Sequence, residues 1–240
     1  MVSRRFILTG AAASVLTPAL VRAEARRPAL TLDDTLAELA LRDGGTLRYS
    51  LKEVMAASGI PAISLAVISR YALADTLAFG TTAVGETSSV RPDTLFQAAS
   101  ISKPVAATAA LALVHQGRLD LDGNVNDRLK SWRVPDNAFT AREKVTLRRL
   151  ISHTAGLSVH GFPGYAAGVP LPTIPQILDG LAPANTEPVR VMFEPGSRQE
   201  YSGGGITIEQ LLMTDVTGRA FADLMHDTVL APTGMTNSTF

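Results

Sequence analysis

Apolar side chains recur every three or four residues in several segments of the chain, a spacing that predicts amphipathic helices. The clearest predicted helix covers residues 102–116 and is recognised by its richness in alanine. Pro104 stands in its first turn, where proline is tolerated, and Gly117 follows its end. The apolar spacing predicts helices over residues 31–42 and 50–58, and we expect further helices over residues 145–152, 206–217 and 221–230.

Two short segments between the helices predicted over residues 50–58 and 102–116 follow a different pattern. Residues 62–68 form an apolar run rich in β-branched side chains, and residues 73–79 supply a candidate partner strand. We therefore expect a β-hairpin here. Residues 80–93, 118–141 and 156–181 are rich in turn-forming residues, so we interpret them as loops.

Composition narrows the classes of protein to which the chain can belong. Of its 240 residues, 46% are hydrophobic and 18% are charged, a balance typical of a globular protein. The net charge is zero, aromatic residues make up 5%, and no basic block stands out, so nucleic acid is not an expected partner. The chain has no cysteine, which excludes disulfides and thiolate chemistry.

The first 25 residues have the three-part pattern of an export signal. Arg4 and Arg5 precede an apolar run over residues 6–21, and small residues follow at Ala23 and Ala25. The paired arginines indicate the twin-arginine route. We expect residues 1–25 to be removed, residues 26–240 to form the mature domain, and the protein to be periplasmic or secreted without a stable membrane span. The alternative is an N-terminal helix with a chance arginine pair.

Residues 100–103 read Ser-Ile-Ser-Lys at the start of the clearest predicted helix. A serine hydroxyl is a weak nucleophile until a base removes its proton. Because residues three apart on a helix share a face, the Lys103 amine can contact the Ser100 oxygen. Free N–H groups at a helix start also favour developing negative charge. The sequence thus predicts a nucleophile with its activator, the alternative being an N-cap serine and a solvated lysine.

Residues 201–205 read Tyr-Ser-Gly-Gly-Gly and form the second candidate element. A tyrosine close to a lysine ammonium has a lowered pKa and can act as a base. Glycines let the backbone approach a ligand closely. Tyr201 is therefore a candidate catalytic residue and Gly203 a candidate substrate-binding residue, whereas the alternative is a turn with an ordinary buried tyrosine.

Several motifs in order resemble one family: the class C β-lactamases, the penicillin-binding D-alanyl-D-alanine peptidases and the β-lactamase-like carboxylesterases. The resemblance runs from about residue 51 to residue 240. Its motifs are Phe-Gln-Ala-Ala-Ser-Ile-Ser-Lys at 96–103, Leu-Ile-Ser-His-Thr-Ala-Gly-Leu at 150–157, Phe-Glu-Pro-Gly at 193–196, the tyrosine segment at 201–205, and Pro-Thr-Gly-Met at 232–235.

The resemblance implies an α+β fold of the β-lactamase/transpeptidase type, in which a helical region packs on an antiparallel sheet. It implies that Ser100 attacks a carbonyl and becomes acylated, while Lys103 and Tyr201 share the proton transfers and either is the base. The Ser100 N–H then supplies half of an oxyanion hole. The implied partner is a small-molecule or short-peptide substrate with an ester, amide or β-lactam bond, and no cofactor is expected.

Two departures from the family pattern change this expectation. Many β-lactam-hydrolysing members have Tyr-x-Asn where this chain has Gly203, which slightly favours an esterase over a β-lactamase. The family's third motif, Lys-Thr-Gly or His-x-Gly on a late strand, does not follow Tyr201. We therefore expect a domain whose C-terminal strands are absent and whose activity is low. The alternatives are an inactive fragment or a catalytically inactive protein of this fold that binds peptidoglycan-like peptides.

A catalytic or metal-binding role for the histidines is less favoured than the serine, lysine and tyrosine site. His153 follows Ser152 and invites a Ser-His-Asp interpretation, but the lysine and tyrosine already fill the role of base. The four histidines of the chain lack the spacing of metal ligands, so we expect no metal site.

Overall fold

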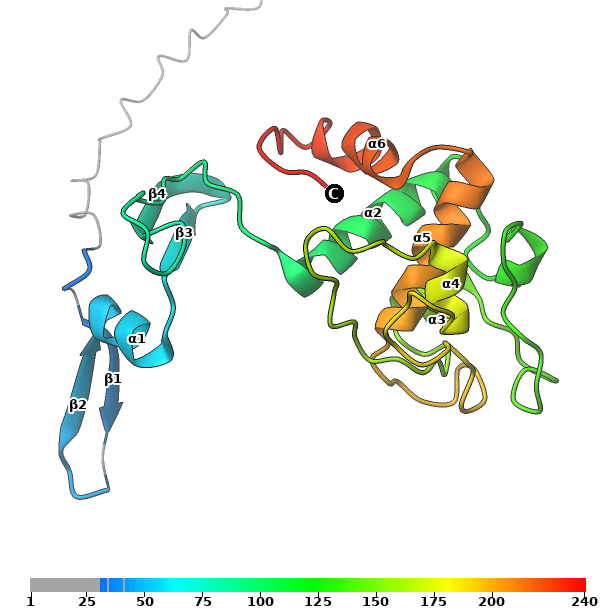
Figure 1. Cartoon of the computed structure of the whole chain (residues 1–240), viewed down its shortest axis with the longest axis horizontal. Helices are drawn as coiled ribbons and strands as arrows, with labels where there is room; N and C mark the ends of the chain where they lie inside the picture. Colours follow the sequence, from blue (N-terminus) through cyan, green and yellow to red (C-terminus); the bar gives the residue numbers. More distant parts are fainter. Residues whose placement is uncertain (1–30, 34, 41) are drawn as a thin grey trace, which may run out of the picture. The chain divides into compact units, whose positions relative to one another are not determined.

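The structure is a computed structural model that describes residues 31–33, 35–40 and 42–240. The predicted export signal at residues 1–25 lies outside these residues. The chain divides into two compact units, and the boundary falls between Thr94 and Leu95. Figure 1 labels the elements of each unit, and the two units are taken in turn below.

The first unit begins with a hairpin where the sequence predicted a helix. Strand β1 (Thr35–Ala40) pairs antiparallel with β2 (Thr46–Ser50). Between them the Gly45 N–H donates to Asp43 Oδ1 at 2.9 Å, and Gly44 has a φ of 84°. The helix predicted over residues 31–42 is therefore wrong, because the Asp-Gly-Gly turn folds this segment back onto the strand that follows.

The rest of the first unit confirms the predicted helix and hairpin. Helix α1 (Leu51–Ser58) begins with a capping box, in which the Ser50 hydroxyl accepts the Glu53 N–H and the Glu53 carboxylate accepts the Ser50 N–H. It ends at Gly59, which has left-handed backbone angles. Strands β3 (Ala62–Ser69) and β4 (Ala72–Gly80) then form an antiparallel hairpin.

The second unit is helical and contains every candidate site residue. Its longest helices are α2 and α5, and the shorter α3, α4 and α6 pack around α5 or α2 (Figure 1). The helical elements of this second unit are η1 (Ala99–Ile101), α2 (Ser102–His115), η2 (Val125–Asp127), α3 (Leu147–Ile151), α4 (Ile174–Asp179), α5 (Gly203–Thr217), α6 (Phe221–Met225) and the π-helical turn η3 (His226–Leu230).

These helices confirm the predictions over 102–116 and 145–152 and correct two others. Helix α4 lies inside the segment interpreted as a loop, where Thr173 and Gln176 form a capping box despite the surrounding glycines and prolines. Helix α5 begins at Gly203, three residues before the predicted start, because the Ser202 hydroxyl accepts the Gly205 N–H and caps the helix.

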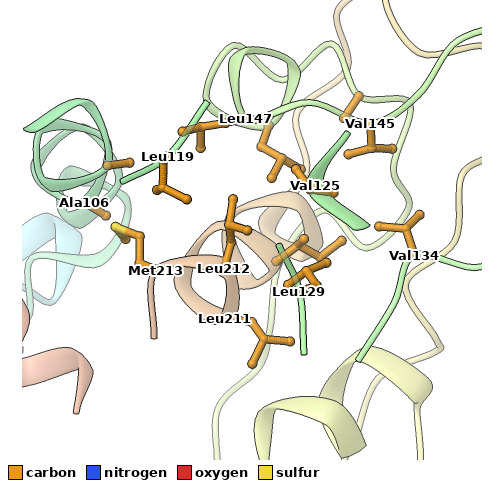
Figure 2. Close-up of a cluster of buried hydrophobic side chains, with 14 of the residues drawn as sticks. Ala106, Leu119, Val125, Leu129, Val134, Val145, Leu147, Leu211, Leu212 and Met213 are labelled. Carbon is orange, nitrogen blue, oxygen red and sulfur yellow. The ribbon is translucent and has the colours of Figure 1, made fainter. Parts of the chain in front are cut away.

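Buried aliphatic side chains of α5 form the centre of the core of the second unit. Figure 2 shows Leu211, Leu212 and Met213 of α5 among side chains from α2, α3 and the intervening loop. Each fully buried leucine or methionine contributes roughly 1.5–3 kcal/mol relative to an exposed one. This core fixes α5 against α2 and α3, and so fixes the two helix starts that carry the candidate site.

One carboxyl is buried in the same core. Glu209 of α5 is fully buried, and neither of its side-chain oxygens has a hydrogen-bond partner among the described residues. Burial raises its pKa to about 8. A carboxyl in such a place is protonated at pH 7, since burying its ionised form without a partner is costly.

None of the helices in the described part of the chain combines the length and apolar composition that crossing a bilayer requires.

Candidate active site

Ser100 lies at the transition from the turn η1 to helix α2 and is exposed. The residue before it, Ala99, has a φ of 45°, a left-handed conformation that is uncommon for a residue with a Cβ. Strain of this kind costs about 1–3 kcal/mol and persists only where the surrounding structure imposes it. The conformation of Ala99 leads into the start of α2, where Ser100 is exposed and the lysine one turn later can reach it.

Lys103 and Tyr201 both contact the Ser100 hydroxyl. The Lys103 Nζ donates to Ser100 Oγ at 3.0 Å, and the Tyr201 hydroxyl donates to the same oxygen at 2.8 Å. The first contact is local to one helical turn, whereas the second joins residues 101 positions apart in the chain. The structure therefore brings together the three residues that the sequence singled out as catalytic, while their roles in a reaction remain a prediction.

The Tyr201 phenol lies in an environment that favours its ionised form. Its interaction with the Lys103 ammonium, and secondly its hydrogen bond to Ser100, lower the pKa of Tyr201 below its ordinary value. The Lys103 Nζ also lies 5.0 Å from the centre of the phenol ring. A phenol placed between a serine and an ammonium can therefore take part in proton transfer at the serine oxygen.

The segment carrying Tyr201 is fastened to residues 153–160 by main-chain hydrogen bonds. The Glu200 N–H donates to the His153 carbonyl at 2.8 Å. The Gly203 and Gly204 N–H groups each donate at 3.0 Å, to the carbonyls of residues 160 and 159 respectively. The Ser202 hydroxyl donates to the carbonyl of residue 158 at 2.8 Å. The residues on both sides of Tyr201 are thus held in place by hydrogen bonds to residues 153–160.

The glycines at the start of α5 face the protein's own chain. An ideal Cβ on Gly204 would lie 2.8 Å from both γ-carbons of Val189. A Cβ on Gly203 would lie 3.0 Å from the His160 carbonyl oxygen and 3.3 Å from a ring carbon of Phe162. Residues 203 and 204 therefore leave little room for a side chain, because neighbouring loop residues pack against them. Gly203 does line the cavity beside Ser100.

A cavity of about 870 Å³ opens in front of Ser100. It is large enough for a small-molecule ligand, and it combines apolar walls with a few polar groups. Beyond the three candidate residues, its side chains include the polar Gln97, His160, Thr207 and Gln210 and the aromatic Phe162, Phe221 and Phe240.

Two histidines flank Tyr201, and sequence reasoning did not predict this. The imidazole of His153 lies 4.4 Å from the phenol ring between centroids, and that of His160 lies 4.8 Å from it. The Ser202 N–H donates to His153 Nδ1 at 3.3 Å. His153 therefore contacts Tyr201 and the residue after it, whereas the hydroxyl of Ser100 is bonded to the lysine and tyrosine. Within the described residues, no group of three histidine or acidic side chains is arranged to hold a metal ion.

A protein-family model described as Beta-lactamase matches residues 47–240 of the chain. Among curated proteins, Esterase EstB of Burkholderia gladioli is 32% identical over 160 residues, covering 63% of this chain and 40% of the esterase. Penicillin-binding protein 4 of Amycolatopsis lactamdurans is 30% identical over 179 residues, covering 75% of this chain and 44% of that protein. The chain therefore spans less than half the length of these two relatives.

The crystal structure of a Beta-lactamase/D-alanine Carboxypeptidase from Yersinia pestis complexed with citrate is also similar. It matches with a TM-score of 0.62 and 26% identity, covering 78% of this chain and 52% of that one. This likeness, together with the family match, confirms the predicted α+β fold of the β-lactamase/transpeptidase type.

Proposed function

Because the chain belongs to the beta-lactamase family, we propose that it is a serine hydrolase that forms an acyl-enzyme on Ser100 and prefers carboxylic esters to β-lactams. The observation that carries this proposal is the convergence of two proton-transferring groups on one serine oxygen. The Tyr201 hydroxyl and the Lys103 amine lie 2.8 Å and 3.0 Å from Ser100 Oγ.

The proposed reaction proceeds in two steps. First, Ser100 Oγ gives its proton to the Tyr201 phenolate or to the neutral form of the Lys103 amine and attacks the carbonyl carbon. The bond to the leaving alcohol then breaks, and the alcohol takes up that proton, which returns the base to its deprotonated form. The Ser100 N–H stabilises the negative oxygen of the tetrahedral intermediate. In the second step a water molecule, deprotonated by Tyr201, attacks the acyl-enzyme, and Ser100 regains its proton as the acid is released.

The preference for esters is supported by the wall of the cavity at Gly203. The place that a side chain would occupy there is bounded by the His160 carbonyl and the Phe162 ring, so no side-chain amide can project from this position. A glycine at this position offers no side-chain amide to pair with the substrate amide next to a β-lactam ring, and an unpaired polar group is costly. An ester with an apolar acyl group meets no such penalty. The names of the relatives include both an esterase and a penicillin-binding protein, so both bond types belong in the test.

Steady-state hydrolysis of p-nitrophenyl butyrate and of nitrocefin tests the proposal. The purified protein is compared with Ser100→Ala, which retains the cavity but lacks the nucleophile. We expect kcat/KM for the ester to exceed that for the β-lactam by about tenfold or more, which corresponds to about 1.4 kcal/mol in transition-state binding. Neither substrate should be turned over by Ser100→Ala above the rate in buffer.

Two outcomes would contradict the proposal in different ways. Faster turnover of nitrocefin would reverse the predicted preference while leaving Ser100 as the nucleophile. Equal rates for the wild type and Ser100→Ala would remove the hydrolase function altogether. In that case the alternative, a catalytically inactive protein that binds peptidoglycan-like peptides, would replace it.

A further inference from the structure

His153 contacts the segment around Tyr201 at three points. Its carbonyl accepts the Glu200 N–H at 2.8 Å, its Nδ1 accepts the Ser202 N–H at 3.3 Å, and its ring lies against the phenol at 4.4 Å. The residues immediately before and after Tyr201 are therefore both bonded to the same histidine. A displacement of Tyr201 would have to break at least one of these contacts.

The backbone of His153 is held in an unusual conformation to make these contacts. Its φ is 58°, in the left-handed region that a residue with a Cβ rarely adopts. Such conformations cost about 1–3 kcal/mol and cluster at functional sites. The cost is offset here because this conformation lets the carbonyl and the ring of one residue bond to the same loop.

The imidazole must be neutral to accept a hydrogen bond at Nδ1, and its surroundings favour that state. Burial, then the charge of Lys103, then that of His160, lower the pKa of His153 below its ordinary value. Acceptance at Nδ1 places the proton of the neutral ring on Nε2. The ring thus acts as a fixed acceptor on one edge and an aromatic surface on its face.

We propose that His153 is a positioning residue for the Ser100 reaction: by accepting the Ser202 N–H and packing against the phenol, it holds the Tyr201 hydroxyl at hydrogen-bond distance from Ser100. This inference rests on the proposed function, since it concerns the same site. His153 itself transfers no proton, because the Ser100 oxygen is already bonded to Tyr201 and Lys103. It acts by keeping the phenol within reach.

A matched pair of substitutions separates the side chain's role from that of the backbone. Both asparagine and glycine tolerate the left-handed conformation of residue 153. Both substitutions remove the ring, but the amide oxygen of His153→Asn can take the place of Nδ1 as acceptor, whereas His153→Gly offers no acceptor. Any difference between the two variants therefore reports the side-chain contact with Ser202 and not a change in backbone strain.

The first measurement is a spectrophotometric titration of Tyr201, which needs no enzymatic activity. The tyrosinate absorbance of each protein is compared with that of the same protein carrying Tyr201→Phe, so that only Tyr201 contributes to the difference. We expect the lowered pKa of Tyr201 to return toward its ordinary value in His153→Gly, because the phenol moves away from Lys103. In His153→Asn the pKa should stay close to that of the wild type.

The second measurement is the turnover of p-nitrophenyl butyrate by the same proteins. We expect His153→Gly to lower kcat by about 10- to 100-fold with little change in KM, since small misplacements of a reacting group have effects of this size. His153→Asn should restore most of the loss. A wild-type pKa for Tyr201 in His153→Gly, or equal losses in the two variants, would overturn the proposal. If the wild type hydrolyses nothing, the proposed function fails, but the titration still decides whether His153 positions Tyr201.

Discussion

Glu209 offers a quantitative test of the structure, because it places an acid in the core without a partner. Its side chain is fully buried on α5, and both of its oxygens lack a hydrogen-bond partner among the described residues. Replacing it by glutamine keeps the size and shape of the neutral acid and removes the ability to ionise. We therefore expect Glu209→Gln to stabilise the protein, and to do so in a pH-dependent way.

The magnitude follows from the pKa of Glu209 in the two states of the chain. Burial raises it from an ordinary 4.5 to about 8 in the folded protein. Below pH 4.5 the carboxyl is protonated whether the chain is folded or unfolded, so it has no effect on the equilibrium. Between pH 4.5 and about 8 only the unfolded chain releases the proton, so the free energy of unfolding falls as the pH rises, by about 1.4 kcal/mol per pH unit.

The destabilisation from Glu209 thus reaches about 3 kcal/mol at pH 7 and about 5 kcal/mol above pH 8. That is a large fraction of the 5–15 kcal/mol that typically separates a folded domain from its unfolded state. At or below pH 4.5 Glu209→Gln should differ little from the wild type. Glu209→Leu should be more stable than the wild type even there, by roughly 1–3 kcal/mol, because it removes an unpaired polar group.

Urea unfolding at several pH values between 4.5 and 8.5 measures this effect. The single tryptophan, Trp132, is buried in the second unit and donates its indole N–H to Asp179, so its fluorescence reports unfolding of the unit that contains Glu209. All other titrating groups are common to the two proteins and cancel in the difference between wild type and Glu209→Gln. A difference that does not change with pH would refute the reasoning, because it would mean that Glu209 titrates normally.

Two further predictions concern the first turn of α5 and the tyrosine before it. Gly204→Ala should destabilise the protein by about 1–3 kcal/mol, because the new Cβ would lie 2.8 Å from Val189. The control Gly205→Ala, whose Cβ would meet only ordinary contacts from 3.4 Å, should be neutral or slightly stabilising. Urea midpoints that fall equally for both variants would contradict this. Ester turnover should rise as the pH rises through the pKa of Tyr201, which lies below 10.0, because the phenolate can accept the serine proton; a pH–rate profile of Tyr201→Phe that retains this limb would exclude Tyr201 as its source.

The sequence predicted those elements whose signals are local. Helix α1 has apolar residues at helical spacing and ends at a glycine, and α2 is rich in alanine and is also followed by a glycine. The hairpin of β1 and β2 was missed because apolar residues over a short segment fit a helix and a strand equally well, and the turn at Asp43 decided between them. Helix α4 was missed because its segment is rich in glycine and proline and was therefore interpreted as a loop, although Thr173 caps the helix.

In the candidate site, too, local contacts could be predicted from the sequence, whereas contacts between distant segments could not. The contact between Ser100 and Lys103 follows from helical spacing, so it could be predicted from four residues. The contact of Tyr201 with Ser100 depends on how distant segments fold, and only the order of the motifs pointed to it. The place of His153 beside Tyr201 depends on a left-handed backbone conformation and on hydrogen bonds between two loops, neither of which leaves a periodic signal in the sequence.

The central claim is that the Ser100 oxygen is the nucleophile and that Lys103 and Tyr201 activate it. The most direct measurement is mass spectrometry of the protein after incubation with a fluorophosphonate, followed by peptide mapping. We expect one adduct, located on Ser100, absent from Ser100→Ala and formed more slowly by Lys103→Ala and Tyr201→Phe. An adduct on another residue, or equal labelling of Ser100→Ala, would contradict the claim.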